Sequence, residues 1–216
     1  MPRVDSKNII SRGGLISDDF IENTRAENFK NPAIAHSKFG IFSGSAPDSK
    51  KELEEQIRNA FDVLVEKWDS IDYIYSKFDV SRARERWILP LLQHLGFDPV
   101  FNQKALTLDE KGKLKYHISH RGWADTAAPP AHTVPQVELE QPYVQGGHKR
   151  SPHDEVQKFL NASPSHLWGI VTNGSLLRVL RDYHHTSTKG YVQFDVENIL
   201  RDRSYSDFRA MYRLVH

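Results

Sequence analysis

The segment Leu167–Asp182 reads LWGIVTNGSLLRVLRD, and this stretch decides the fold. Two mainly apolar runs, Trp168–Thr172 and Leu176–Leu180, flank the pair Asn173-Gly174. Asn and Gly both tolerate positive φ angles, so this pair between two apolar runs is typical of a tight hairpin. The sequence therefore predicts a β-hairpin with a type I′ turn.

Helix signals lie on both sides of this hairpin along the chain. Ser49 and Glu52 form a capping box, in which each side chain accepts a backbone N–H, and apolar residues follow at helical spacing. Ser151 followed by Pro152 is a second opening, which predicts a helix to about Asn161. Further helices are expected at Asp18–Ala26, at Ser81–Leu95 with Pro90 inside it, and from about Ser206 onward.

Short apolar runs between the helices predict the remaining strands: Asp98–Phe101, Ala105–Leu108, Lys113–Ser119, Thr133–Glu140 and Tyr191–Phe194. Helices, then a mixed sheet with one crossing helix, then a final helix indicate an α+β (mixed α/β) fold. We expect an N-terminal helical segment over residues 1–80 and an α/β domain over residues 81–216. The two form either separate units or one continuous domain.

Composition excludes several classes of protein. The chain has 216 residues, no cysteine, and 29 basic against 28 acidic side chains, which gives a formal net charge of +1. Disulfide scaffolds and thiolate sites are therefore ruled out, and any basic surface must be local. No apolar run is long enough to span a membrane, and the first residues lack a signal-peptide core. We expect a cytoplasmic location and no membrane partner.

Two common enzyme motifs are missing, and the histidines form no known metal pattern. No Gly-rich phosphate loop and no G-x-S-x-G elbow occurs, which disfavours nucleotide binding and serine hydrolysis. Eight of the eleven histidines lie between His117 and His185 without H-E-x-x-H spacing. We expect them to be solvated loop side chains.

Three carboxylates are candidates for nuclease chemistry. Asp125 precedes the predicted strand, which carries Glu138 and Glu140 on one face. Mg²⁺ in nucleases is held by one or two such acids and the substrate phosphate. A lysine commonly follows two residues after the second acid, but Glu140 occupies that position. The alternative is a solvated face of an edge strand that also contains Pro135.

Basic residues offer local contacts for a phosphate backbone. Lys149 and Arg150 directly precede the cap at Ser151, and a helix N-terminus beside cations can hold a phosphate. Arg178 and Arg181 lie three apart on a strand and are expected to face opposite ways. Arginines 82, 84 and 86 cluster near the start of the second helix. All of these side chains could equally be solvated surface, and none predicts base-specific contacts.

Two segments, Ser151–Gln157 and Leu167–Asp182, resemble the N-terminal region of large bacterial DNA adenine methylases of the type IIG restriction–modification kind. The closest resemblance is to class I methylases of phage-defence (DISARM-like) islands. Further segments extend it over nearly the whole chain: Gly13–Leu15, the helix with Trp68, Trp87–Phe97, Tyr191–Asp195 and Asp207–His216.

The resemblance implies a nuclease-like fold of the PD-(D/E)xK type, a mixed sheet with flanking helices. It assigns Asp125 and Glu138 as the acids that would hold Mg²⁺, puts Glu140 in place of the catalytic lysine, and matches Gln157 to a glutamine on the following helix. The missing lysine implies a degenerate nuclease.

The methylase motifs themselves do not occur in this sequence. Pro129-Pro130 is flanked by alanines rather than by the Asn/Asp and Tyr/Phe that grip a target adenine, and no Gly-rich S-adenosylmethionine loop is present. The resemblance thus implies that S-adenosylmethionine binds a methylase portion outside this chain. This chain alone is expected to need no cofactor, unless Mg²⁺ serves a nuclease.

Three functions follow as alternatives. The first is a silent nuclease-like domain of a bacterial DNA methylase or defence protein, which engages DNA or partner subunits. The second is an active Mg²⁺-dependent endonuclease, in which Gln141 or Lys149 takes the role of the lysine. The third is a non-enzymatic module that docks other defence subunits.

Overall fold

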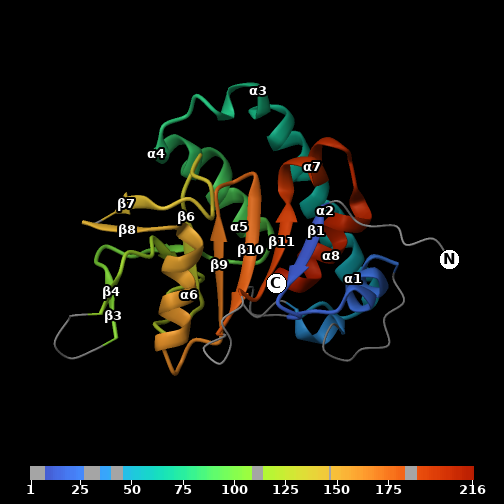
Figure 1. The fold of residues 1–216 in the computed structure, drawn as a ribbon. Helices are drawn as coiled ribbons and strands as arrows, with labels where there is room; N and C mark the ends of the chain where they lie inside the picture. Colours follow the sequence, from blue (N-terminus) through green and yellow to red (C-terminus); the bar gives the residue numbers. More distant parts are fainter. Residues whose placement is uncertain (1–7, 27–34, 40–45, 109–113, 146, 183–188) are drawn as a thin grey trace.

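A computed structural model describes residues 8–26, 35–39, 46–108, 114–145, 147–182 and 189–216. Its centre is a seven-stranded sheet in the order β1-β11-β10-β9-β6-β5-β2 (Figure 1). The strands are β1 (Ile9–Arg12), β2 (Val100–Phe101), β5 (His120–Arg121), β6 (Pro130–Thr133), β9 (Trp168–Thr172), β10 (Leu176–Arg181) and β11 (Tyr191–Asp195).

Helices cover both faces of this sheet, which confirms the α+β fold. One face packs against α6 (Pro152–Ala162). The other packs against a layer formed by α2 (Lys50–Asp69), α5 (Leu89–His94), α7 (Val196–Arg201) and α8 (Tyr205–Val215). Shorter elements are α1 (Asp18–Arg25), a 3₁₀ turn (His36–Lys38), α3 (Asp72–Tyr75), α4 (Val80–Ala83) and a π-helical turn (Arg84–Ile88). Two small ribbons pair β3 (Leu106–Thr107) with β4 (Lys115–Tyr116) and β7 (Tyr143–Gln145) with β8 (His148–Arg150).

The connection between β6 and β9 sets the topology. Strands β2, β5 and β6 are antiparallel neighbours, whereas β9 runs parallel to β6 with Ala131 opposite Ile170. A parallel pair needs a crossover, and α6 supplies it. The next strands, β10, β11 and β1, continue antiparallel from β9.

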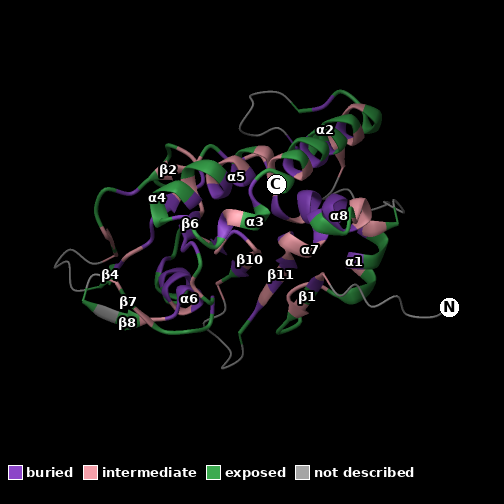
Figure 2. Ribbon diagram, turned by 90° about the horizontal axis from the view of Figure 1, so that it is seen from above, coloured by how far each residue is buried: buried purple, intermediate pink, exposed green. Residues whose placement is uncertain are grey.

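The first eighty residues and the rest of the chain share one sheet and one core. β1 pairs with β11 through Ile9 and Phe194, and Leu53 of α2 is buried in the same cluster as Phe208 of α8. In Figure 2, buried residues of α2 and α8 face each other across this layer. Among the described residues, no helix combines the length and the apolar character needed to cross a membrane.

The helix starts follow the capping signals in the sequence. The Ser49 hydroxyl accepts the N–H of Glu52 at 3.2 Å, and the Ser151 hydroxyl accepts the N–H of Asp154 at 3.1 Å. Gly96 ends the second predicted helix at φ 93°, a conformation that glycine adopts without strain. The predicted helices at 18–26 and from 206 are confirmed as α1 and α8.

One predicted strand, Thr133–Glu140, is wrong beyond its first residue. β6 ends at Thr133, and the chain then turns, with the Val137 N–H bonded to the Val134 carbonyl at 3.2 Å. Pro135 has no N–H for a ladder, and Gln136 has φ 61°. Glu138 and Glu140 therefore lie on a turning segment and not on one face of a strand.

The predicted hairpin is present as β9 and β10, but its turn is not type I′. A type I′ turn needs positive φ at both central residues, and Asn173 is not among the described non-glycine residues with positive φ. Thr172 pairs with Leu177, so the loop is longer. The Asn173 Oδ1 accepts the N–H groups of Ser175 and Leu176, at 3.2 and 2.8 Å.

The helical layer is fastened to this turn by two aromatic side chains. Trp87 Nε1 donates to the Gly174 carbonyl at 2.8 Å, and the Tyr75 hydroxyl donates to the Asn173 carbonyl at 2.8 Å. Gly174 has φ 94°, and a Cβ there would overlap the Tyr75 hydroxyl and come within 2.9 Å of Trp87 Cδ1.

We predict that Gly174→Ala destabilises the protein more than Gly14→Ala does. Both positions have positive φ, which costs about 1 kcal/mol for alanine. At position 174 the added Cβ also overlaps buried aromatic rings, which costs roughly 1–3 kcal/mol more. At position 14 the added Cβ has no atom within 4 Å, so this second cost is absent. Urea unfolding of both variants measures this difference, and equal losses would contradict the close packing of the turn.

Candidate functional site

Two of the predicted acids, Asp125 and Glu138, are not brought together. Asp125 is exposed in the loop before β6, where its Oδ1 accepts the N–H of Ala127 at 2.9 Å. Glu138 is exposed beyond the other end of β6, in a polar hollow that Asn173 also lines. The two carboxylates thus lie past opposite ends of one strand and do not form the pair that would hold Mg²⁺. Within the described residues, no cluster of three or more His, Asp or Glu side chains is arranged to bind a metal ion.

Glu140 and Arg178 meet in an ion pair that the sequence did not suggest. Arg178 Nη1 lies 2.5 Å from Glu140 Oε1, and Lys189 Nζ lies 2.5 Å from Glu140 Oε2. Lys189 Nζ is also 3.5 Å from Asp154 Oδ1, and Arg178 Nη1 lies 3.2 Å from His153 Nδ1. Two carboxylates and two cations therefore balance one another beside the start of α6.

The hydrogen bonds in this ion cluster set the protonation of its members. Burial alone would raise the pKa of Glu140, but hydrogen bonds from Lys189 and Arg178 outweigh it and lower that pKa to about 2. Burial lowers the pKa of His153 to about 4, so its Nδ1 accepts from Arg178 as a neutral ring at pH 7. The imidazole also meets the Tyr191 ring edge-on at 5.3 Å.

Ser151 and Gln157 serve the architecture of α6. The buried Ser151 hydroxyl is used as the N-cap. Gln157 Nε2 donates to Asn161 Oδ1 at 2.8 Å and to the Arg181 carbonyl at 2.9 Å, which ties α6 to the end of β10. The Gln157 Oε1 atom is buried and has no hydrogen-bond partner among the described residues.

The basic candidates differ in what they contact. Lys149 is exposed on β8, and no described residue pairs with its ammonium group. Arg150 Nη1 lies 3.2 Å from Glu155 Oε2. Arg178 faces α6 and is buried, whereas Arg181 is exposed on the other face, 5.6 Å from the Trp168 ring, as their spacing predicted. Lys149 is therefore the most accessible cation of this set.

A buried polar network at the C-terminal end of β6 went unrecognised in the sequence. His132 is fully buried, and its Nδ1 accepts the N–H of Ser119 at 3.2 Å while Nε2 lies 3.2 Å from the Tyr143 hydroxyl. Glu155 accepts the N–H of His117 at 2.6 Å in the same region. These contacts hold the β7–β8 ribbon and the start of α6 against the sheet.

On the opposite face of β6, three side chains meet at one hydroxyl. Arg84 Nε donates to Thr133 Oγ1 at 2.9 Å, and Arg84 Nη2 donates to the Thr133 carbonyl at 3.0 Å. His120 Nδ1 lies 3.4 Å from the same Oγ1 and 2.9 Å from Ser119 Oγ. His120 is buried under Phe101, whose ring meets it edge-on at 5.4 Å.

The expectation that the histidines are solvated loop residues is wrong for His120, His132 and His153, which are all buried. Burial and the Arg84 charge lower the pKa of His120 to about 4. Burial, Arg84 and the neighbouring histidines lower the pKa of His132 to about 3. Burial and the Glu155 charge raise the pKa of Tyr143 to about 12. All these groups are neutral at pH 7, so the network donates and accepts hydrogen bonds without charge except at Arg84, Arg150 and Glu155.

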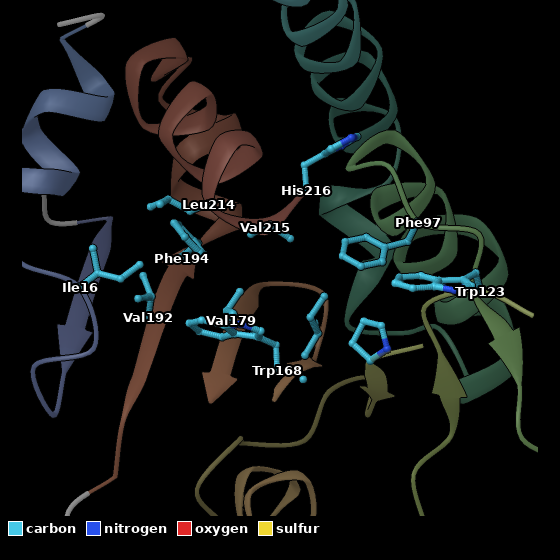
Figure 3. Close-up of a pocket in the computed structure, with 13 residues that line it drawn as sticks. Ile16, Phe97, Trp123, Trp168, Val179, Val192, Phe194, Leu214, Val215 and His216 are labelled. Carbon is cyan, nitrogen blue, oxygen red and sulfur yellow. The ribbon is translucent and has the colours of Figure 1, made fainter. Parts of the chain in front are cut away.

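An apolar cavity of about 280 Å³ lies on the face opposite α6, near the end of α8. In Figure 3, Phe97 and Trp123 lie side by side on one wall, with Trp168 and Val179 across from them. His216 is the one imidazole in this lining, and burial lowers its pKa. None of the predicted catalytic residues lines this cavity.

Comparison of the chain with protein-family models, with curated proteins and with solved structures found no match.

We predict that stability falls as the pH drops below about 6.5. The buried histidines are neutral in the folded protein down to about pH 4, whereas unfolded histidines protonate near 6.5. Each such histidine then costs about 1.4 kcal/mol per pH unit, because the unfolded state binds more protons. In urea unfolding at pH 7, 6 and 5, His132→Asn, which keeps an acceptor for the Ser119 N–H, should reduce this slope by about that amount.

Glu140→Gln is the matched control for this titration. The low pKa of Glu140 means that its contribution to stability is present above about pH 4.5 and is lost only between there and about pH 2. Glu140→Gln should lower stability by about 1 kcal/mol or less at pH 7, since the carboxylate is 44% exposed. It should leave the change in the free energy of unfolding between pH 6 and pH 5 the same as in the native chain. Equal slopes for His132→Asn and the native chain would show that His132 is not a neutral buried group.

Proposed function

We propose that this chain is a nuclease-like module that contacts DNA without cutting it, within a bacterial DNA methylase, restriction–modification or phage-defence protein of the cytoplasm. The observation that carries the proposal is the separation of the acids. Asp125 and Glu138 lie past opposite ends of β6, and Glu140 is neutralised by Arg178 and Lys189. A dication needs convergent carboxylates that other cations have not already neutralised.

The polar groups at the end of β6 also support contact with DNA without metal-dependent cutting. On the face of β6 away from α6, the side chains at its end are neutral His120, the Thr133 hydroxyl and the cation of Arg84. Such a set donates hydrogen bonds and carries positive charge, which suits a phosphate oxygen rather than a metal ion.

The β7–β8 ribbon supports contact with a DNA backbone. Lys149 is exposed on β8, where it pairs with Val144 of β7, and the adjacent Tyr143 of β7 is anchored to His132. The ribbon is thereby held in place beside the N-terminus of α6. Partners under this proposal are DNA, a methylase portion that would hold S-adenosylmethionine, and other defence subunits.

An active endonuclease is the second candidate, and one contact favours it. Lys189 lies against two carboxylates, Glu140 and Asp154, as a catalytic lysine lies against metal-binding acids. Arg178 opposes this interpretation, because a buried guanidinium 2.5 Å from Glu140 disfavours a dication there.

We predict that the purified chain does not cleave plasmid DNA with Mg²⁺ or Mn²⁺. The acids do not converge, so a metal ion would find at most one uncompensated carboxylate. Gel analysis of supercoiled plasmid measures nicking. Metal-dependent cutting that Glu138→Gln or Glu140→Gln abolishes would refute the silent module and favour the endonuclease.

We also predict DNA binding that weakens with salt and depends on Lys149. Lys149→Ala should reduce affinity several-fold and lower the slope of log affinity against log salt by about 1, since one phosphate contact is lost. Fluorescence anisotropy with a labelled duplex measures both quantities. Lys51→Ala, on the exposed start of α2, is the control and should change neither. If the chain shows no salt-sensitive binding at all, the protein-docking alternative replaces the DNA proposal.

A further inference from the structure

The helix that carries Arg84 contains a widened turn. α4 and α5 are joined by the π-helical turn Arg84–Ile88, and such turns often occur at functional sites because they cost helix stability. The end of this turn is buried, with Trp87 bonded to the β9–β10 loop. Its beginning directs the Arg84 guanidinium to the end of β6.

Arg84 differs from most of the partly buried arginines in its partners. Carboxylates lie within 4 Å of five others, namely Arg25, Arg150, Arg178, Arg209 and Arg213. Arg84 donates to the Thr133 hydroxyl and carbonyl, which are neutral, and no described carboxylate pairs with it. A half-buried cation without a counter-ion has lost hydration that nothing charged replaces. Burial accordingly lowers the pKa of Arg84.

His120 supplies a hydrogen-bond donor at the same place. Its Nδ1 lies within hydrogen-bonding distance of Ser119 Oγ and Thr133 Oγ1, which can both donate to it. A neutral ring that accepts at Nδ1 carries its proton on Nε2. The side chain is only 3% exposed, and no described residue accepts from Nε2. The guanidinium and the imidazole Nδ1 therefore meet at Thr133, and no described residue accepts from Arg84 Nη1 or from His120 Nε2.

We propose that Arg84 and His120 bind a phosphate-type oxyanion at the end of β6. Arg84 supplies the charge and an Nη1 donor that no described residue uses, and His120 supplies a neutral N–H; a phosphate has several acceptor oxygens for such donors. This inference deepens the proposed function, because a DNA phosphate is the occupant when the chain is bound to a duplex. Free inorganic phosphate has the same chemistry and is the other source.

The test measures thermal unfolding in phosphate and in chloride at equal ionic strength. A ligand that binds only the folded state raises Tm. Phosphate should raise the Tm of the native chain and of Arg86→Gln, an exposed arginine on the same turn. It should raise the Tm of Arg84→Gln clearly less, because only the general effect of phosphate on burial remains there. An equal rise in all three proteins, or no rise in any, overturns the proposal.

A second measurement needs no substitution. In ¹⁵N NMR of the native chain, the His120 Nε2 resonance should shift on titration with inorganic phosphate and stay constant with chloride. A constant His120 resonance overturns the proposal even if Arg84→Gln fails to fold. If Arg84→Gln does not fold, Arg84→Lys takes its place. This variant keeps the positive charge but loses the several N–H donors of the planar guanidinium. It should therefore lose most of the rise in Tm that phosphate causes.

Duplex binding separates the two sources of phosphate. Arg84→Gln should weaken duplex affinity about tenfold, whereas Arg86→Gln should change it little. If phosphate raises Tm through Arg84 but duplex affinity is unchanged, the oxyanion site stands and DNA as its occupant is refuted. If Lys149 is needed for DNA binding but phosphate has no effect at Arg84, the proposed function stands and the oxyanion site is refuted.

Discussion

The parallel pairing of β6 with β9 is the constraint on which the rest of the structure depends. It joins two antiparallel groups of strands, β2-β5-β6 and β9-β10-β11-β1, into one sheet. Parallel neighbours cannot be linked by a tight turn, so the chain must cross over, and α6 packs on the sheet as it does so. Without this pairing the two groups of strands would have no shared core.

The register of this pairing also decides where the polar groups meet. His132 lies opposite Val171, Val171 opposite Arg178, and Arg178 opposite Gln193, in one row across the sheet on the side of α6. The first turn of α6 lies over this row, because His153 contacts Arg178 and Glu155 bonds to the strand segment before β5. Polar residues from five segments distant in sequence thus become neighbours, and among the described residues the buried Nε2 of His153 is left without a hydrogen-bond partner.

Local signals in the sequence predicted the parts of this fold that depend on local chemistry. Ser49, Ser151 and Gly96 sit where the helices begin and end, since caps involve residues only a few positions apart. The prediction failed at Thr133–Glu140, where alternation indicated a strand and Pro135 ended it. That failure moved Glu138 and Glu140 off a common face and with them the predicted metal pair.

The site itself could not be predicted because burial is decided by distant partners. His120 and His132 carry no local pattern, and their environment depends on Arg84, which is dozens of residues away along the chain. The same holds for Glu140, whose partner Lys189 lies 49 residues later. Sequence periodicity reports which side chains face inward, but not which charge each will meet.

The net charge of +1 conceals an uneven distribution of carboxylates among the basic side chains. Glu54 faces Arg209 and Arg213, Asp207 faces Arg25, and Glu140 faces Arg178, so each of these arginines has a carboxylate within 4 Å. Lys149 and Arg84 have no such described partner. Lys149 lies on the strand that pairs with Tyr143, and Arg84 acts electrostatically on the same Tyr143. A chain that is almost neutral as a whole therefore has, among its described residues, two cations without a carboxylate partner, Arg84 at the end of β6 and Lys149 on the β7–β8 ribbon, and the proposed phosphate contacts rest on these two.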